Sequence, residues 1–199
     1  MKNFLVIFNG QANCGKDTLE NFMADQFWSQ RIENKESLYE LGAKVYNIPY
    51  SAYRELCVKR ELKDTISPLL KGLTPRQSII HVSNVVKSQI NRSAFSIDIA
   101  KRVESYFDGN NESCIVTTNI GYQDEYDDIV QYLTGKNIDI ILINLTKDSE
   151  NDDIKLDARE DIINKHDNVK TFEIVIKKEN DVSVAENELS DIISSCITS

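Results

Sequence analysis

The chain has 199 residues, 41% of them hydrophobic and 28% charged, which fits one globular domain that needs no disulfide or structural metal for its core. Its 23 basic and 32 acidic residues give a net charge of −9, which argues against binding to nucleic-acid duplexes through a basic face. No apolar run is long enough for a signal peptide or a membrane span. The four cysteines lie far apart without a C-x-x-C pair, which favours reduced thiols and a cytoplasmic protein: Cys14, Cys57, Cys114 and Cys196.

Short runs rich in β-branched residues predict five buried strands. In chain order they are residues 4–8, 44–48, 114–117, 138–145 and 171–176. Apolar residues recur at helical spacing between or after these runs, in 19–27, 124–133 and 182–196. Strands that alternate with helices indicate a parallel sheet covered by helices on both faces.

Two longer stretches interrupt this alternation. Residues 49–113 are predicted to form several helices, one of which begins with Thr74 as its N-cap and Pro75 at its first position. Residues 146–168 turn polar and acidic, which predicts a mobile, lid-like surface segment. We find no repeat and no linker, so the chain is expected to form a single domain over residues 1–199.

The most informative motif follows the first predicted strand and precedes the first predicted helix. It reads Gly-Gln-Ala-Asn-Cys-Gly-Lys-Asp-Thr over residues 10–18. Glycines let successive backbone N–H groups point at phosphates, the helix N-terminus adds a positive dipole, and a lysine adds a full charge. An ordinary strand-to-helix turn is the alternative. The residues expected to hold the ATP phosphates are Gly10, Ala12, Asn13, Cys14, Gly15, Lys16, Asp17 and Thr18.

The motif departs from the common G-K-[ST] ending, because Asp17 occupies the hydroxyl position and Thr18 follows it. A carboxylate cannot donate to phosphate but can face Mg²⁺, so Asp17 and Thr18 are the predicted metal-binding residues. Phosphate-loop proteins include switches, motors and small-molecule kinases. A chain of this length favours a kinase, which needs only a nucleotide site, an acceptor pocket, cationic clamps and a lid.

Four segments carry a resemblance to a known family. They are G-K-D-T at 15–18, T-P-R at 74–76, residues 118–125 against a segment that usually reads S-D-V-R-F-P-N-E, and residues 157–160 against an H-x-S-E-like lid element. Together, in this order, they resemble the bacteriophage-type deoxynucleoside monophosphate kinases of the phosphate-loop nucleotide kinase superfamily.

The resemblance implies ATP-dependent and Mg²⁺-dependent phosphorylation of a deoxynucleoside monophosphate. It also implies a three-layer α/β/α fold with a five-stranded parallel sheet, a helical acceptor region near 49–113 and a lid near 146–168. By position, Lys16 would contact the transferred phosphoryl group and Arg159 would be the catalytic lid cation. Arg76, with the adjacent Gln77, and Arg54 would bind the acceptor phosphate.

Departures from the family pattern leave two other functions open. Asn119 stands where the family has an acid and Gly121 where it has an arginine, which removes a magnesium ligand and a phosphate clamp. A kinase of another small acceptor and a degenerate nucleotide-binding protein are therefore alternatives. For Arg159, which lies among acidic residues, a surface ion pair is the competing interpretation. The expected partners are nucleotides, and a homodimer stays open.

Overall fold

The computed structural model describes residues 2–11, 14–109, 115–148, 161–177 and 182–198. The chain divides into two compact units, which we call the sheet unit (1–33 and 99–199) and the helical unit (34–98). Helix α5 (Ala94–Asp108) begins in the helical unit and ends in the sheet unit.

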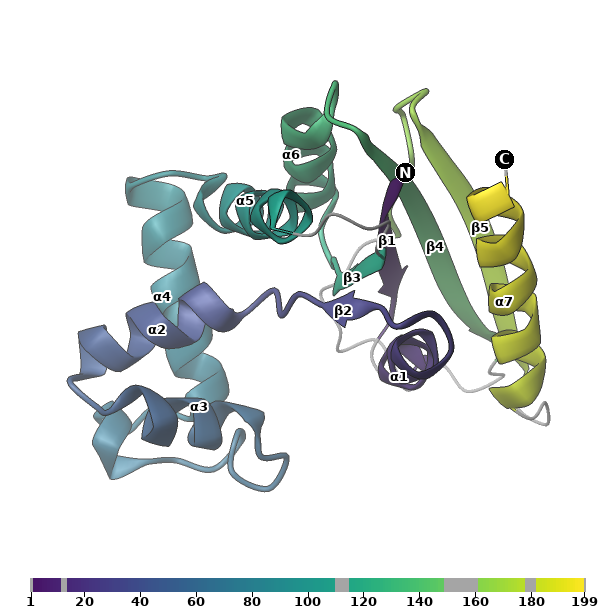
Figure 1. The fold of residues 1–199 in the computed structure, drawn as a ribbon. Coiled ribbons are helices and arrows are strands. Elements are labelled where there is room, and N and C mark those ends of the chain that lie inside the picture. The colour runs from purple at the N-terminus through teal and green to yellow at the C-terminus, as the bar shows by residue number, and fades with distance from the viewer. Residues whose placement is uncertain (1, 12–13, 110–114, 149–160, 178–181, 199) are drawn as a thin grey trace. The chain divides into compact units, whose positions relative to one another are not determined.

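The sheet unit is built on five parallel strands, whose spatial order is β2-β3-β1-β4-β5 (Figure 1). The predicted α/β class with a five-stranded parallel sheet is therefore confirmed. The strands are β1 (Asn3–Gly10), β2 (Gln30–Arg31), β3 (Ile115–Asn119), β4 (Ile138–Asp148) and β5 (Val169–Lys177). Strand order reverses beside β1, and ligands of open parallel sheets bind at the carboxyl ends of the strands near such a reversal.

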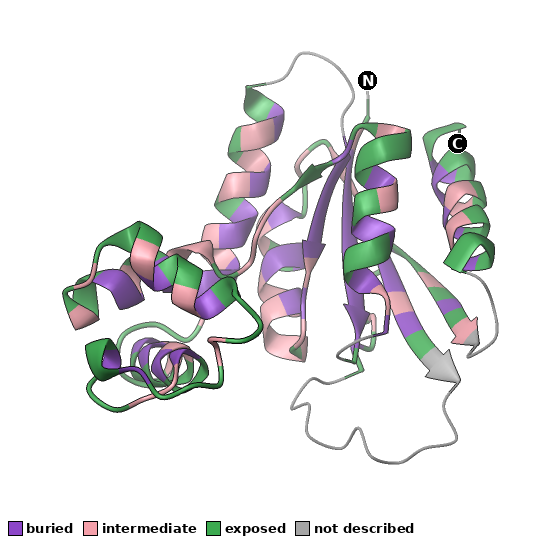
Figure 2. Ribbon diagram, turned by 90° about the horizontal axis from the view of Figure 1, so that it is seen from below, coloured by how far each residue is buried: buried purple, intermediate pink, exposed green. Residues whose placement is uncertain are grey.

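Alternating side chains of β1 divide the core into two layers, one on each face of the sheet. Leu5 and Ile7 pack with α5 and α6 (Gln123–Leu133), whereas Val6 and its even-numbered neighbours pack with α1 (Lys16–Phe27) and α7 (Val182–Thr198). Burial on both faces explains why β1 is apolar without alternation (Figure 2). Each fully buried Leu or Ile side chain contributes about 1.5 to 3 kcal/mol.

The helical unit packs α2 (Glu36–Tyr46), α3 (Tyr50–Val58) and α4 (Pro75–Gln89) around Tyr53. The Tyr53 hydroxyl lies 2.8 Å from Ser78 Oγ, and a Cβ on Gly42 would come within 2.4 Å of the Tyr53 ring, so glycine is required there. Thr74 and Gln77 form a capping box at the start of α4, which confirms the predicted helix entry at Pro75.

One predicted strand is wrong. Lys44 and its neighbours to Tyr46 form the last turn of α2, and the chain turns at Asn47, whose φ is 54°. The apolar residues of this stretch suit a strand by themselves, but in the structure Leu38, Tyr39, Gly42 and Ala43 are buried at helical spacing while Val45 is exposed. The second strand is instead the exposed pair Gln30–Arg31, which carries no apolar signal. The other four predicted strands are confirmed, the third from Ile115 onward.

Within the described part of the chain, no helix is both long and apolar enough to cross a membrane. Cys14, Cys57 and Cys196 are buried free thiols, and Cys114 lies outside the described residues.

Candidate phosphate-binding site

The loop between β1 and α1 depends on two glycines with positive φ. At Gly10 the angle is 144°, and a Cβ would lie 2.5 Å from the Leu145 carbonyl oxygen of β4. At Gly15 the angle is 93°, and a Cβ would lie 2.9 Å from Ile176 Cδ1 of β5. Both positions therefore need glycine, and the backbone wraps closely over the carboxyl end of the sheet.

Lys16 opens α1 and concentrates positive charge at this loop. Its residue is only 7% exposed, and Nζ donates to the Gly10 carbonyl at 2.6 Å and to the Gln11 carbonyl at 2.5 Å. Cys14 is buried beside it, with Sγ 3.4 Å from Nζ. An ammonium held at a helix N-terminus, among glycine backbone, is the arrangement that binds phosphate.

The two predicted metal-binding residues both present oxygen atoms at the surface. Asp17 and Thr18 are exposed in the first turn of α1, and Asp17 Oδ1 accepts a hydrogen bond from Arg31 Nη2 at 3.2 Å. Carboxylate and hydroxyl oxygens suit a hard cation such as Mg²⁺.

A buried carboxylate lies next to this turn. The Glu20 side chain is 1% exposed. Its Oε2 accepts a hydrogen bond from Asn119 Nδ2 at 2.9 Å and forms an ion pair with Arg31, whose Nε lies 3.0 Å away. Burial raises the pKa of Glu20 to about 7, although Arg31 and Asn119 favour its ionised form. The arrangement ties α1, β2 and the end of β3 together through one carboxylate.

Sequence reasoning missed Glu20 and Arg31, which interact directly at this loop. Glu20 follows Lys16 by four residues and so shares its helix face, between the buried Leu19 and Met23. A single acid on an apolar face was the available signal. Arg31 carried no such signal in the sequence, because it reaches the loop only when β2 pairs with β3, where Arg31 lies opposite Thr117.

Asn9 fixes the point at which β1 enters the loop. Its Nδ2 donates to the Ile120 carbonyl at 3.0 Å, and its Oδ1 accepts from the Ile162 backbone N–H at 3.2 Å. Asn144 of β4 donates to the Ile162 carbonyl at 3.3 Å. The buried Asn9 and the half-buried Asn144 thus hold the segment at Ile162, which leads to β5, against the carboxyl ends of β1 and β4.

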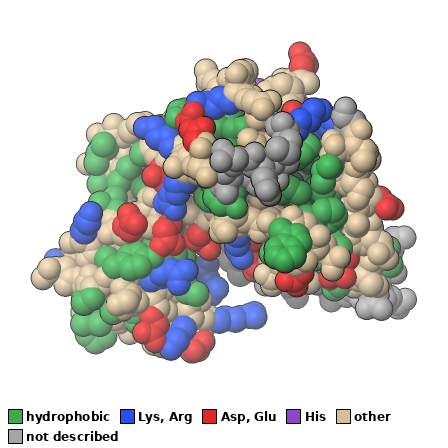
Figure 3. All heavy atoms as spheres, viewed as in Figure 1, with side chains coloured by type: hydrophobic (Ala, Val, Ile, Leu, Met, Phe, Trp, Pro, Cys, Tyr) green, Lys and Arg blue, Asp and Glu red, His purple; other side chains and the backbone are tan. Residues whose placement is uncertain are grey.

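The predicted acceptor-binding residues all lie in the helical unit, where carboxylates neighbour both arginines. Arg76 on α4 binds Asp64 through two hydrogen bonds of 2.6 and 3.1 Å, and this pair lowers the pKa of Asp64. Arg54 on α3 lies 3.7 Å from Glu36. Figure 3 shows Lys and Arg side chains interspersed with Asp and Glu over the visible face of this unit.

The predicted role of Gln77 competes with a structural one. Its Oε1 accepts from the Thr74 backbone N–H at 2.9 Å, while its own N–H donates to the Thr74 hydroxyl at 3.2 Å. The amide oxygen of Gln77 is therefore used to begin α4.

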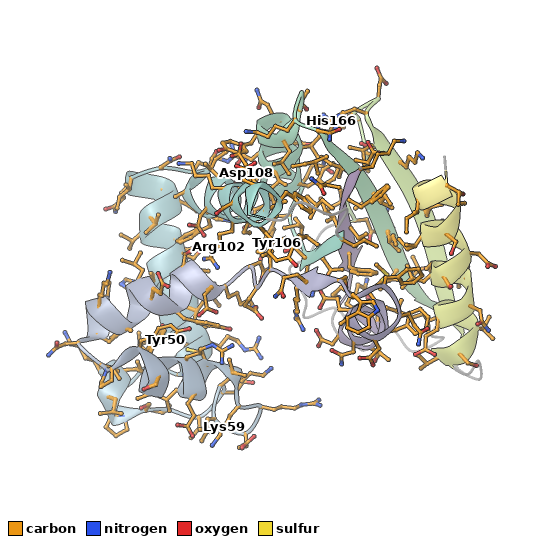
Figure 4. All side chains as sticks on the ribbon, in the orientation of Figure 1. Tyr50, Lys59, Arg102, Tyr106, Asp108 and His166 are labelled. Carbon is orange, nitrogen blue, oxygen red and sulfur yellow. The ribbon has the colours of Figure 1, made fainter. Side chains whose placement is uncertain are left out.

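Three predicted site residues, Ala12, Asn13 and Arg159, lie outside the described residues, as does much of the predicted lid. The last part of the predicted lid, 161–168, is bound to α6. The Ile163 backbone exchanges two hydrogen bonds with the Gln123 side chain. Nε2 of His166, which is labelled in Figure 4, lies 2.9 Å from Asp127 Oδ1. Residues 161–168 thus follow the surface of α6 before β5 begins.

No protein-family model and no curated protein matches the chain. Among solved structures, a putative kinase from Chloroflexus aurantiacus aligns over 98% of both chains with a TM-score of 0.50 and 12% identity. A thymidylate kinase from Candida albicans covers 98% of this chain and 92% of its own, with a TM-score of 0.48 and 11% identity. A sugar kinase from Janibacter covers 94% of this chain and 92% of its own, with a TM-score of 0.48 and 14% identity. Sequence identities this low indicate a shared fold alone, and the two structures with TM-scores below 0.5 do not add to that conclusion.

Proposed function

We propose that the protein is a phosphate-loop kinase that transfers the γ-phosphoryl group of ATP to a nucleoside monophosphate, with a deoxynucleotide as the preferred acceptor. The observation that carries this proposal is the loop itself, in which Gly10 ends the central strand, Gly15 precedes α1 and the buried Lys16 begins that helix. Its position at the carboxyl end of a parallel sheet supports nucleotide binding. The resemblance to the bacteriophage-type kinases supports the choice of acceptor.

Lys16 would act first, by exchanging its bonds with the Gly10 and Gln11 carbonyls for the β and γ phosphates of ATP. Phosphate oxygens offer the ammonium stronger, charge-assisted hydrogen bonds than neutral carbonyls do. The backbone N–H groups at the start of α1 would hold the same phosphates without adding formal charge, so an acidic protein can bind a polyanion.

Magnesium fits the oxygen groups beside this loop, namely the exposed Asp17 carboxylate and Thr18 hydroxyl. A bound Mg²⁺ supplies charge neutralisation to the phosphoryl oxygens during transfer. Asp17 would leave its single 3.2 Å hydrogen bond with Arg31 to face the ion.

The acceptor phosphate would be bound by Arg76 and Arg54. Arg76 already holds a carboxylate with two parallel hydrogen bonds, the geometry with which a guanidinium also binds phosphate. Asp64 and Glu36 would then be displaced by the incoming dianion. Arg159 would add positive charge to the transferred group from the lid.

Release of ADP in the presence of ATP and Mg²⁺, measured over a panel of nucleoside and deoxynucleoside monophosphates, tests the proposal. We expect turnover with at least one monophosphate and a loss of about 100-fold or more in Lys16→Ala, because a phosphate-binding charge is removed. Lys2→Ala, which removes an exposed lysine paired with Asp139, is the matched control and should retain full activity.

Three other outcomes would contradict the proposal. Turnover no greater than that of Lys16→Ala, together with ATP-induced thermal stabilisation, indicates a degenerate nucleotide-binding protein. Activity only on a non-nucleotide alcohol indicates a kinase of another acceptor. No thermal shift with ATP and Mg²⁺ removes the nucleotide site altogether.

A further inference from the structure

We propose that Glu20, rather than a residue at the end of β3, supplies the buried carboxylate that faces the Mg²⁺ ion of the bound nucleotide. The inference rests on the proposed function, because it requires nucleotide at the loop. It adds a residue that neither the loop motif nor the family resemblance assigns.

The two oxygen atoms of the Glu20 carboxylate have different surroundings. Oε2 of Glu20 accepts a hydrogen bond from Asn119 and forms an ion pair with Arg31, whereas Oε1 is buried and has no hydrogen-bond partner among the residues that the structure describes. A buried acceptor without a partner is unfavourable, and more so when it is charged. The atom therefore points to a ligand that arrives later.

The carboxylates around Arg31 carry an excess of negative charge. Three carboxylates, those of Asp17, Glu20 and Glu33, lie 3.2, 3.0 and 3.9 Å from a single guanidinium, that of Arg31. One positive group cannot neutralise three negative ones, so the cluster favours a further cation. A divalent ion that arrives with the nucleotide would meet this excess next to Lys16.

The remaining ligands of the ion would come from the nucleotide phosphates and from water. Among the described residues, no three His, Cys, Asp or Glu side chains are placed to hold a metal ion by themselves. Magnesium commonly takes one or two carboxylates and completes its shell with substrate phosphates and water. Glu20 needs to contribute only one oxygen, either to the ion or to a water molecule in its shell.

Asn119 explains why the carboxylate is on α1. An amide at the end of β3 carries no charge for a metal ion, but its Nδ2 fixes Glu20 Oε2 at 2.9 Å and so orients the other oxygen. Outer groups that orient a ligand in this way typically change metal affinity by 10-fold to 100-fold when they are removed.

The experiment measures the dissociation constant of ATP by calorimetry, once with Mg²⁺ and once with EDTA. For Glu20→Gln we expect the gain in affinity that Mg²⁺ provides to fall about 10-fold, with ATP binding in EDTA unchanged. Asp25→Asn is the matched control, because it removes an exposed carboxylate from the same helix that is not part of the Arg31 cluster, and it should behave like the wild type.

A double variant that exchanges the two side chains tests the proposal even if Glu20→Gln alone folds poorly. Glu20→Gln combined with Asn119→Asp exchanges the amide and the carboxylate, preserves the net charge and should recover most of the Mg²⁺ dependence. A thermal melt of each variant establishes that it is folded.

Two results would overturn the role of Glu20. An unchanged Mg²⁺ dependence in Glu20→Gln shows that the ion does not face this carboxylate. Equal weakening of ATP binding with Mg²⁺ and with EDTA shows that Glu20 only supports Arg31 and the loop. If the wild type binds ATP in neither condition, the proposed function itself fails, and this inference fails with it.

Discussion

The cationic side chains at the candidate phosphate-binding loop are held differently from those predicted to bind the acceptor in the helical unit. In the sheet unit Lys16 is 7% exposed and is fixed by backbone carbonyls, and Arg31 is anchored by the buried Glu20. In the helical unit the Arg54 and Arg76 side chains are 45% and 56% exposed and pair with carboxylates at the surface. The first unit positions its charges before any ligand arrives, whereas the second holds them in pairs that are easily exchanged.

This difference has energetic consequences. Exposed ion pairs are screened and contribute little to stability, so exchanging Asp64 for a phosphate costs the helical unit almost nothing. A buried carboxylate is expensive unless it is fully paired, so changes at Glu20 affect folding and ligand binding together. Changes to the sheet unit should therefore produce larger effects than matched changes to the helical unit.

The largest expected effect is steric and compares glycines of the two units. Gly10→Ala puts a methyl group 2.5 Å from the Leu145 carbonyl oxygen, whereas Gly72, at φ 86° in the helical unit, has nothing within 4 Å of an added Cβ. We expect a loss of about 3 kcal/mol for Gly10→Ala and about 1 kcal/mol for Gly72→Ala. Urea denaturation measures both, and equal losses would show that the loop relaxes freely.

The next effect is the pH dependence of stability that Glu20 introduces. Its pKa is about 7 in the folded protein and about 4.5 in the unfolded chain, so the folded state binds more protons between these values. The Glu20 contribution is most favourable below pH 4.5 and is lost as the pH rises through 7. Glu20→Gln should therefore gain stability relative to the wild type over this interval.

Thermal melts of both proteins from pH 5 to pH 8 measure this difference. Asp64→Asn in the helical unit is the comparison: Arg76 lowers the pKa of Asp64 below its ordinary value of 3.8, so the Asp64 contribution is lost only in more acidic solution and the difference from the wild type should stay constant from pH 5 to pH 8. A Glu20→Gln difference that does not change with pH would mean that the carboxylate has the same proton affinity in both states.

The smallest effect concerns the acceptor. Asp64→Asn removes the carboxylate that shares Arg76, so a monophosphate no longer has to displace it, and we expect the KM for the acceptor to fall about 2-fold to 5-fold. Initial rates at saturating ATP measure it. Glu61→Gln, a neighbouring acid, is the control, and a KM that rises only in Asp64→Asn would mean that Asp64 holds Arg76 in its binding position.

Local patterns were sufficient for the elements that bury two faces or carry a cap. The uninterrupted apolar run of β1 and the Thr74-Pro75 helix entry were both predicted correctly, because each depends on residues adjacent in the chain. The strand predicted at 44–48 is wrong because a few apolar residues suit a strand or a helix equally. Only packing against Tyr53 selects the helix.

The sequence by itself determined the candidate phosphate-binding loop, since the glycine spacing, Lys16 and the flanking strand and helix are all local. Only the tertiary structure decided what surrounds the loop. Glu20, Arg31 and Asn119 are separated by as many as 99 positions and meet because β2 and β3 pair beside α1. Such contacts depend on strand order and register, which a pattern of neighbouring residues does not encode.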